Sequence, residues 1–278
     1  MASTRGIKRR INSVYSTQQI TRAMYLVAAS KLQKAKSKHE SLRPFIEETI
    51  RITRKITAYI DDTDFYIKKR PVTSTAIIVI SADRGLCGGY NVNVSKAAEA
   101  LLKKKPNEQL ITVGTKTRDY FRKRNKNIIR TYQGISELPF YEDAADIGLL
   151  AIDLFESGEV EEVYLVYTVF NSVINYTPQT LKLLPLESDY DTAGGDMDFE
   201  PDQKAFLSYL IPKYMSTVIY GAMVESAACE QGARMSSMDN ATKNSNRLLN
   251  KFTLKYNRTR QDAITQELTE IVGGADAL

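Results

Sequence analysis

The loop from Ser81 to Asn91 comes closer to a phosphate-binding motif than other parts of this chain. It reads Ser-Ala-Asp-Arg-Gly-Leu-Cys-Gly-Gly-Tyr-Asn and follows the β-branched run Ala76–Ile80, the place where nucleotide-binding α/β folds hold their phosphates. A dinucleotide site needs G-x-G-x-x-G and an acidic residue about twenty positions later. This loop offers Gly85, Gly88 and Gly89 at other spacings and lacks that acid. It therefore favours a tight turn that touches another surface.

Other candidates for chemistry are weaker. The segment from Gly114 to Thr117 imitates the Gly-Lys-Ser/Thr of a P-loop, but a threonine is inserted and the upstream glycine is missing. The single histidine, His39, and the distant Cys87 and Cys229 form no metal-ligand set. Carboxylates such as Glu159 fall in solvated turns with no catalytic histidine near them. We predict no catalytic, cofactor-binding or metal-binding residue and no cofactor.

The charge distribution says more than the net charge of +5. Nine Lys or Arg residues and no Asp or Glu precede His39, which indicates an acidic partner for this end of the chain. The basic runs at 103–105 and 122–124 lack the aromatic residues of single-strand binders, so no nucleic-acid partner is expected. No apolar run approaches the roughly 20 residues of a membrane span and no signal-peptide pattern opens the chain. We expect a protein on the cytosolic side, without membrane insertion.

Two long helices are predicted, one at each end of the chain. Residues 201–274 carry strong helix formers and a heptad stripe, which is Met238, Thr242, Ser245, Leu249, Phe252, Tyr256, Thr259 and Ala263. The first forty-odd residues carry a matching stripe, which is Ile7, Ile11, Val14, Gln18, Thr21, Tyr25, Ala28, Leu32, Ala35 and Leu42. These stripes predict an antiparallel coiled coil in which Leu249 and Phe252 pack near Tyr25 and Leu32, or within a turn or two of them.

The middle of the chain alternates strands with helices. Strands are predicted at 76–80, 110–113, 128–132 and 162–170, with helices at 92–105, 115–124 and 142–157 between them. The run 174–185 follows the last strand after a short turn, so it is predicted to pair antiparallel at the sheet edge. The fold class is therefore α/β: a central doubly wound, Rossmann-like domain at 72–200, flanked by coiled-coil helices at 1–60 and 201–278.

Polar identities along the whole chain resemble one known family. They are Ile11-Asn12-Ser13-Val14, Thr17-Gln18-Gln19-Ile20-Thr21-Arg22-Ala23-Met24, Val27-Ala28-Ala29-Ser30-Lys31-Leu32, Asp83 to Asn91, Glu225-Ser226, Ala233-Arg234-Met235, Met238 to Thr242, and Tyr256 to Gln261 with Ile264 to Leu268. Together these segments resemble the gamma subunits of bacterial rotary ATP synthases. Chance similarity among coiled coils reproduces heptads but not these polar residues.

The resemblance implies a rotor shaft without an active site of its own. Such a shaft stands inside a ring of alpha and beta subunits and couples ion-driven rotation of the membrane ring to conformational cycling of the catalytic beta subunits. The implied partners are alpha, beta, epsilon and the membrane c-ring, with one copy of this chain per complex. The implied place is the cytosolic face of the bacterial plasma membrane, as a peripheral subunit.

The resemblance also implies roles for particular residues. Contacts with the beta-subunit levers and catch loops fall on Met24, Arg260, Gln261, Thr265 and Glu267. A basic face toward acidic levers falls on Arg9, Arg10 and Lys31. Glu200 falls where the foot of the shaft meets the c-ring and epsilon. The turn formed by Asp83, Arg84, Gly85 and Cys87 is expected to face the stator.

Two other classes of function stay open on the residues alone. A small α/β enzyme with a coiled-coil dimerisation arm would bind a phosphate ligand at Asp83 to Asn91. A nucleic-acid-binding coil would show an affinity that falls steeply with salt.

Overall fold

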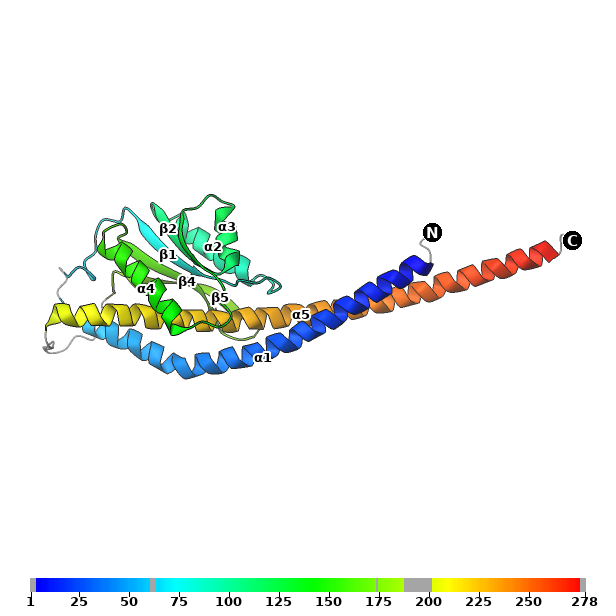
Figure 1. The fold of residues 1–278 in the computed structure, drawn as a ribbon, viewed down its shortest axis with the longest axis horizontal. Helices are drawn as coiled ribbons and strands as arrows, with labels where there is room; N and C mark the ends of the chain where they lie inside the picture. Colours follow the sequence, from blue (N-terminus) through cyan, green and yellow to red (C-terminus); the bar gives the residue numbers. More distant parts are fainter. Residues whose placement is uncertain (1–3, 61–63, 174, 188–201, 276–278) are drawn as a thin grey trace. The chain divides into compact units, whose positions relative to one another are not determined.

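The computed structural model describes residues 4–60, 64–173, 175–187 and 202–275 (Figure 1). The chain divides into two compact units, one formed by residues 1–28 with 235–278 and the other by residues 29–234. Two long helices, α1 (Thr4–Thr57) and α5 (Gln203–Ala275), contribute to both units. The sequence predicted three parts, 1–60, 72–200 and 201–278, whose bounds are the ends of the long helices and of the α/β domain. That division into three parts stays a prediction.

The larger unit, residues 29–234, is built on a five-stranded sheet. Its strands are β1 (Thr75–Ile80), β2 (Glu108–Val113), β3 (Ile128–Tyr132), β4 (Glu162–Phe170) and β5 (Tyr176–Leu184), in the order β3-β2-β1-β4-β5. The first four strands run parallel, and β5 pairs antiparallel with β4 at the edge. The strand positions and the antiparallel edge hairpin predicted from the sequence are confirmed.

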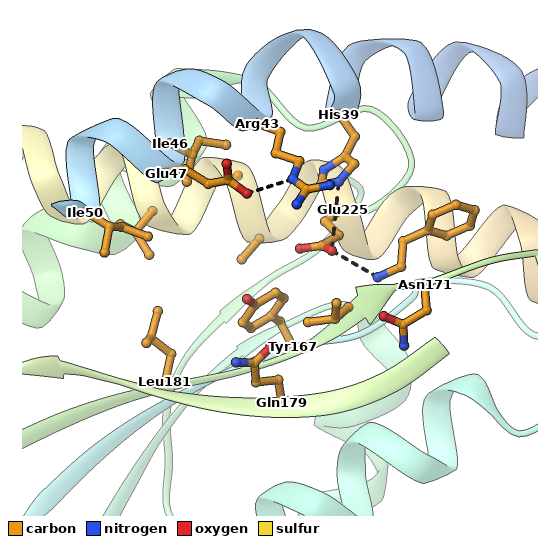
Figure 2. Close-up of a pocket in the computed structure, with 15 residues that line it drawn as sticks. His39, Arg43, Ile46, Glu47, Ile50, Tyr167, Asn171, Gln179, Leu181 and Glu225 are labelled. Carbon is orange, nitrogen blue, oxygen red and sulfur yellow. Dashed lines mark hydrogen bonds and ion pairs between the residues drawn. The ribbon is translucent and has the colours of Figure 1, made fainter. Parts of the chain in front are cut away.

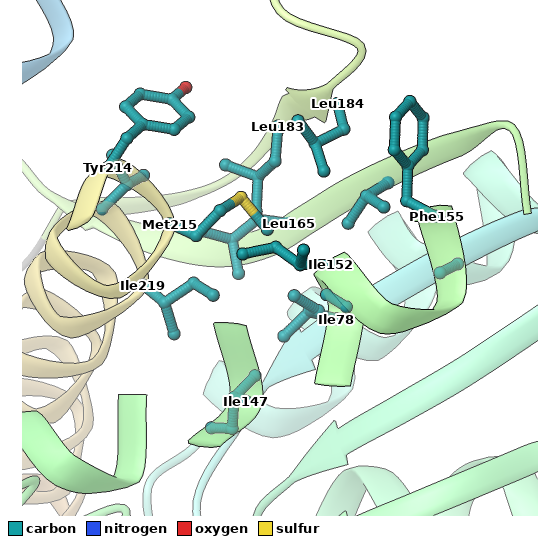
Figure 3. Packing of buried hydrophobic residues seen from close by; sticks show 14 of the residues in the cluster. Ile78, Ile147, Ile152, Phe155, Leu165, Leu183, Leu184, Tyr214, Met215 and Ile219 are labelled. Carbon is teal, nitrogen blue, oxygen red and sulfur yellow. The ribbon is translucent and has the colours of Figure 1, made fainter. Parts of the chain in front are cut away.

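Helices cover both faces of this sheet because β1 is apolar on both sides. Ile77 and Val79 face α2 (Tyr90–Leu102) and α3 (Thr115–Arg122). Ile78 and Ile80 face the opposite way, into the larger core with α4 (Tyr141–Glu156) and the start of α5. In Figure 3 this core brings side chains of β1, β4, β5, α4 and α5 into one cluster. All six residues of β1 are buried, as expected for a central parallel strand. The doubly wound α/β arrangement is therefore confirmed.

The smaller unit, residues 1–28 with 235–278, is an antiparallel pair of helical segments. The hydroxyls of Thr21 and Thr242 are 2.8 Å apart, and the Gln18 amide donates to the Asn246 side chain. Every residue of the two predicted stripes that lies in this unit is buried or half-buried. The predicted antiparallel coil is confirmed.

The register of the coil differs from the one expected. Counting along the two helices from the Thr21–Thr242 pair places Leu249 opposite Val14, about three turns from Tyr25. Both Leu249 and Phe252 are half-buried, so their place on the packed stripe is confirmed while their expected neighbours were wrong. A heptad stripe can slide by seven residues without loss of its pattern, and the polar pairs decide which register forms.

The last turns of α5 leave their apolar residues exposed. Ile264 is 48% exposed, Leu268 58% and Ile271 68%. In the observed register these residues lie beyond the first residue of α1, so they have no partner helix in this unit. The helices of the described residues include none with the length and apolar content of a membrane span.

Candidate interaction surfaces

The turn after β1 is held by one carboxylate, Asp83. Its Oδ1 accepts hydrogen bonds from the backbone N–H and the hydroxyl of Thr115, at 3.0 and 2.9 Å. Its Oδ2 accepts from the Gly134 N–H at 2.9 Å and from the Ser136 hydroxyl at 2.9 Å. The Asp83 N–H donates in turn to the Ser136 oxygen at 3.1 Å. Asp83 thereby joins the three loops that follow β1, β2 and β3.

This carboxylate lies at the N-terminus of α3, the kind of position where α/β folds bind phosphate. Partial burial acts to raise the pKa of Asp83, but hydrogen bonds from Ser136 and Thr115 outweigh it and hold the pKa below its usual value. An ionised Asp83 supplies the negative charge that the helix N-terminus favours. A phosphate at the same N–H groups would have to displace it, which argues against the phosphate-ligand alternative.

The neighbouring residues of the turn are divided between buried and exposed positions. Cys87 is 1% exposed, and its sulfur accepts a hydrogen bond from the Asn91 amide at 3.0 Å. The carbonyl of Gly85 accepts from Arg234 at 3.2 Å. Leu86, by contrast, is 62% exposed and adopts φ of 64°, a left-handed conformation that few non-glycine residues take. Within this turn, the Cys87 side chain therefore faces the interior, whereas the apolar side chain of Leu86 faces solvent.

Three ion pairs that the sequence reasoning missed lie around this turn. Glu230 and Arg234 on α5 form a buried pair at 2.7 Å, at the i,i+4 spacing that could have signalled it. Burial raises the pKa of Glu230 despite the opposing charge of Arg234. Lys31 pairs with Glu137 at 2.7 Å, and Arg84 lies 3.9 Å from the same carboxylate. Lys31, predicted as part of a basic face, is thus already engaged within its own unit.

The smaller unit presents an apolar stripe on α1 beside the packed one. Ile20 is 60% exposed and Val27 is 56% exposed, and Met24 between them is half-buried. The spacing i, i+4, i+7 places all three on one helix face. Arg9 and Arg10, earlier on the same helix, are exposed. No ion-pair partner is recorded for either arginine within the described part of the chain.

The polar residues predicted near the C-terminus form a second exposed surface. Arg260, Gln261, Thr265 and Glu267 are all exposed on α5. At about 100° per residue they lie within an arc of about 160°, so the helix brings them to one side. Their side chains play no part in the packed stripe, which ends with Thr259 and Ala263. Glu200, the predicted foot contact, lies outside the described residues.

No group of three or more histidine, cysteine or acidic side chains suited to a metal ion occurs among the described residues. The exposed groups above offer hydrogen bonds, charge and apolar area to a partner. Such surfaces suit binding between proteins.

Comparisons with known proteins agree along the whole chain. The sequence model of the ATP synthase family matches residues 3–278. The sodium ion specific ATP synthase gamma chain of Acetobacterium woodii is 43% identical over 298 residues, covering 99% of each chain. The ATP synthase gamma chain of Alkaliphilus metalliredigens is 46% identical over 283 residues, covering 98% of this chain and 97% of the relative.

Solved structures share the fold at lower sequence identity. A chain of the Euglena gracilis mitochondrial ATP synthase, in a structure of OSCP, F1 and the c-ring, has a TM-score of 0.76 and 20% identity, covering 99% of this chain and 94% of its own. A chain of the Tetrahymena thermophila mitochondrial ATP synthase central stalk and c-ring has a TM-score of 0.65 and 24% identity, covering 80% and 99%. The two solved structures show that this chain shares their fold. The family is shown by the family model and by the curated relatives of more than 40% identity. This chain belongs to the ATP synthase gamma-chain family.

Proposed function

We propose that this chain is the central rotor shaft of an ATP synthase and has no active site of its own. In this role it couples ion-driven rotation of a membrane ring to the conformational cycling of catalytic beta subunits, and it turns in reverse when ATP is hydrolysed. Family membership supports the proposal, together with the fold shared with a chain of the Tetrahymena thermophila central stalk.

The observation that carries the proposal is the exposed polar set on α5. A helix that already buries its heptad stripe gains nothing in packing from Arg260, Gln261, Thr265 and Glu267, which are exposed on one side of it. Because these polar groups lie on one side of the helix only, the shaft lacks threefold symmetry. A ring of three equivalent subunits can be driven into three different states only by a central object that lacks this symmetry.

We assign the contacts with the beta subunits to two surfaces of the smaller unit. Arg260 and Gln261 supply directional donors to the catch loops, and arginine can bind a carboxylate through two parallel hydrogen bonds. The stripe that contains Met24, together with Arg9 and Arg10, faces the acidic levers. Exposed ion pairs are each worth only about 0 to 1 kcal/mol, so they can exchange as the shaft turns.

The larger unit is assigned to the foot of the shaft. Its turn at Asp83, Arg84, Gly85 and Cys87 faces the stator, with Leu86 as the exposed apolar contact. Glu200 is assigned to the region that meets epsilon and the c-ring. One copy of the chain would then lie at the cytosolic face of the bacterial plasma membrane, held there through the ring rather than by insertion.

Assembly with alpha and beta subunits tests this function. Complexes that carry Arg260→Ala or Gln261→Leu should assemble, because exposed substitutions usually change stability by no more than about 0.5 kcal/mol. Their ATP turnover should nevertheless fall severalfold. Lys255→Ala is the matched control, since Lys255 is also exposed and basic but lies outside the arc of the polar set, about 140° from Arg260 around the helix.

Two results would contradict the proposal in different ways. Normal ATP turnover in the Arg260 and Gln261 complexes would remove the contact assignment. Failure of the chain to enter an alpha–beta complex, or nucleotide binding by the isolated chain in calorimetry, would remove the shaft function itself.

A further inference from the structure

A cavity of about 280 Å³ lies within the larger unit, between α1, the β4–β5 hairpin and α5 (Figure 2). The helix α1 contributes His39 and Arg43 to its lining, the sheet contributes Tyr167 and Gln179, and α5 contributes Glu225. Known ligand pockets start at about 300 Å³, while one water takes about 30 Å³. The cavity is therefore the size of a small organic molecule rather than of a single water or bare ion.

Glu225 is a poorly compensated carboxylate in this cavity. Its side chain is 14% exposed, and its Oε1 accepts one hydrogen bond from the Phe170 N–H at 2.9 Å. The ion-pair partner recorded for it in the described chain is His39, whose Nε2 lies 3.9 Å away, beyond hydrogen-bond distance. Burial raises the pKa of Glu225, although the Phe170 N–H and the charges of His39 and Arg43 act in the opposite direction.

The nearby arginine does not neutralise this group. Arg43 donates from Nε to Glu47 at 2.7 Å, and both side chains are more than 60% exposed at the rim. Across the cavity, burial followed by the charge of Glu225 raises the pKa of Tyr167 to about 12. Apart from the His39 ring, the charged groups that line the cavity are Glu225, Glu47 and Arg43, and the sum of their charges is negative. A buried carboxylate in such surroundings favours a cation with N–H donors.

The remaining lining is apolar except for Asn171. Ile46 and Ile50 of α1 and Leu181 of β5 lie along the cavity, and Figure 2 shows Ile50 and Leu181 from opposite walls. A bare metal ion would gain nothing from these side chains, whereas an aliphatic chain would bury area against them. We propose that the cavity binds a small primary alkylammonium ion, with its ammonium group at Glu225 and its chain along Ile46, Ile50 and Leu181. This site is independent of the proposed shaft function.

The His39 ring lies beside Glu225, where the ammonium group would bind. The His39 Nδ1 atom is buried and has no hydrogen-bond partner among the described residues, so the Nε2 side facing Glu225 carries the polar contact of the ring.

The histidine also provides the measurement, because it is the only one in the chain. In an NMR titration of the full-length protein with n-butylammonium chloride, the single set of imidazole resonances should shift and saturate. Glu225→Gln keeps an acceptor for the Phe170 N–H and should weaken binding about tenfold or more. Glu48→Gln, at an exposed position of α1 outside the cavity lining, should leave it nearly unchanged.

A control with the unmodified protein keeps the test independent of any variant. n-Butanol has the same carbon chain without the charge and should produce no saturating shift at the same concentrations. A shift by n-butanol equal to that by n-butylammonium would overturn the role of Glu225. The absence of saturation with n-butylammonium, or equal binding to Glu225→Gln, would overturn the site.

Discussion

Asp83 offers the sharpest test of how the larger unit is held together. Replacing it with alanine removes the acceptor for the Thr115 and Gly134 N–H groups and for the Ser136 and Thr115 hydroxyls. Hydrogen bonds to a charged group contribute roughly 1.5–3 kcal/mol each, but Asp83 is only half-buried and water can replace part of them. The contributions are also not additive because the donors share one carboxylate. We expect Asp83→Ala to lower the free energy of unfolding by about 3 kcal/mol.

The pH dependence of this loss follows from the direction of the pKa shift. Hydrogen bonds hold the pKa of Asp83 below its usual value in the folded chain, against the effect of burial. Its stabilisation is therefore complete above the unfolded pKa of about 4 and disappears as the pH falls through the folded pKa. The difference between the unmodified chain and Asp83→Ala should be constant from about pH 6 to 8 and should shrink below about pH 4.

Urea unfolding of the isolated chain, followed by far-UV circular dichroism across this pH range, measures both effects. Asp153→Ala on the exposed side of α4 is the matched control and should change stability by less than about 0.5 kcal/mol. Asp83→Asn should fall between the two, since it keeps one oxygen acceptor but turns an NH₂ toward other donors. A loss for Asp83→Ala no larger than that for Asp153→Ala would refute the reasoning, as would a loss that grows in acid.

Two further predictions concern backbone strain and thiol reactivity. Gly114 has φ of 98°, and a Cβ there would lie 2.5 Å from the backbone oxygen of Ser81, so Gly114→Ala should destabilise by roughly 3 kcal/mol or more. Gly134→Ala, at φ of 80° with open space around it, should cost only about 1 kcal/mol, and equal losses in urea unfolding would contradict the close contact. Burial raises the pKa of the thiols of Cys87 and Cys229, so neither should react with iodoacetamide at about pH 8 until the chain is unfolded. Rapid alkylation of either thiol in the native protein would show that its surroundings open.

Periodicity predicted the elements well because it reports local burial. The β-branched run at 76–80 became a fully buried central strand, and the two heptad stripes became the packed sides of the coil. The hydrogen bonds of Asp83 could not be predicted in the same way. They join loops that are adjacent only because the sheet order is β3-β2-β1-β4-β5, and no local pattern encodes that order.

The sequence also could not predict which individual side chains contact residues of the long helices. Lys31 was predicted to lie on an exposed basic face of the N-terminal helix. In the structure it forms an ion pair at 2.7 Å with Glu137, which comes from a loop distant in sequence. Cys87 belongs to a turn expected to face outward, yet its side chain packs in a small cluster with Tyr90 and Cys229. In both cases the deciding contact lies far along the chain, and only the assembled larger unit brings the partners together.

The register of the coil connects packing to the exposed surfaces. A slide by one heptad would keep apolar residues against apolar residues, so the stripe alone leaves several registers close in energy. It would separate Thr21 from Thr242 and leave partly buried hydroxyls without this partner, which favours the observed alignment. That alignment sets how far α5 continues past the first turn of α1, and hence leaves Ile264 and Leu268 exposed beside the polar set. The same two threonines that select the fold of the smaller unit thereby select which residues of α5 a surrounding partner can reach.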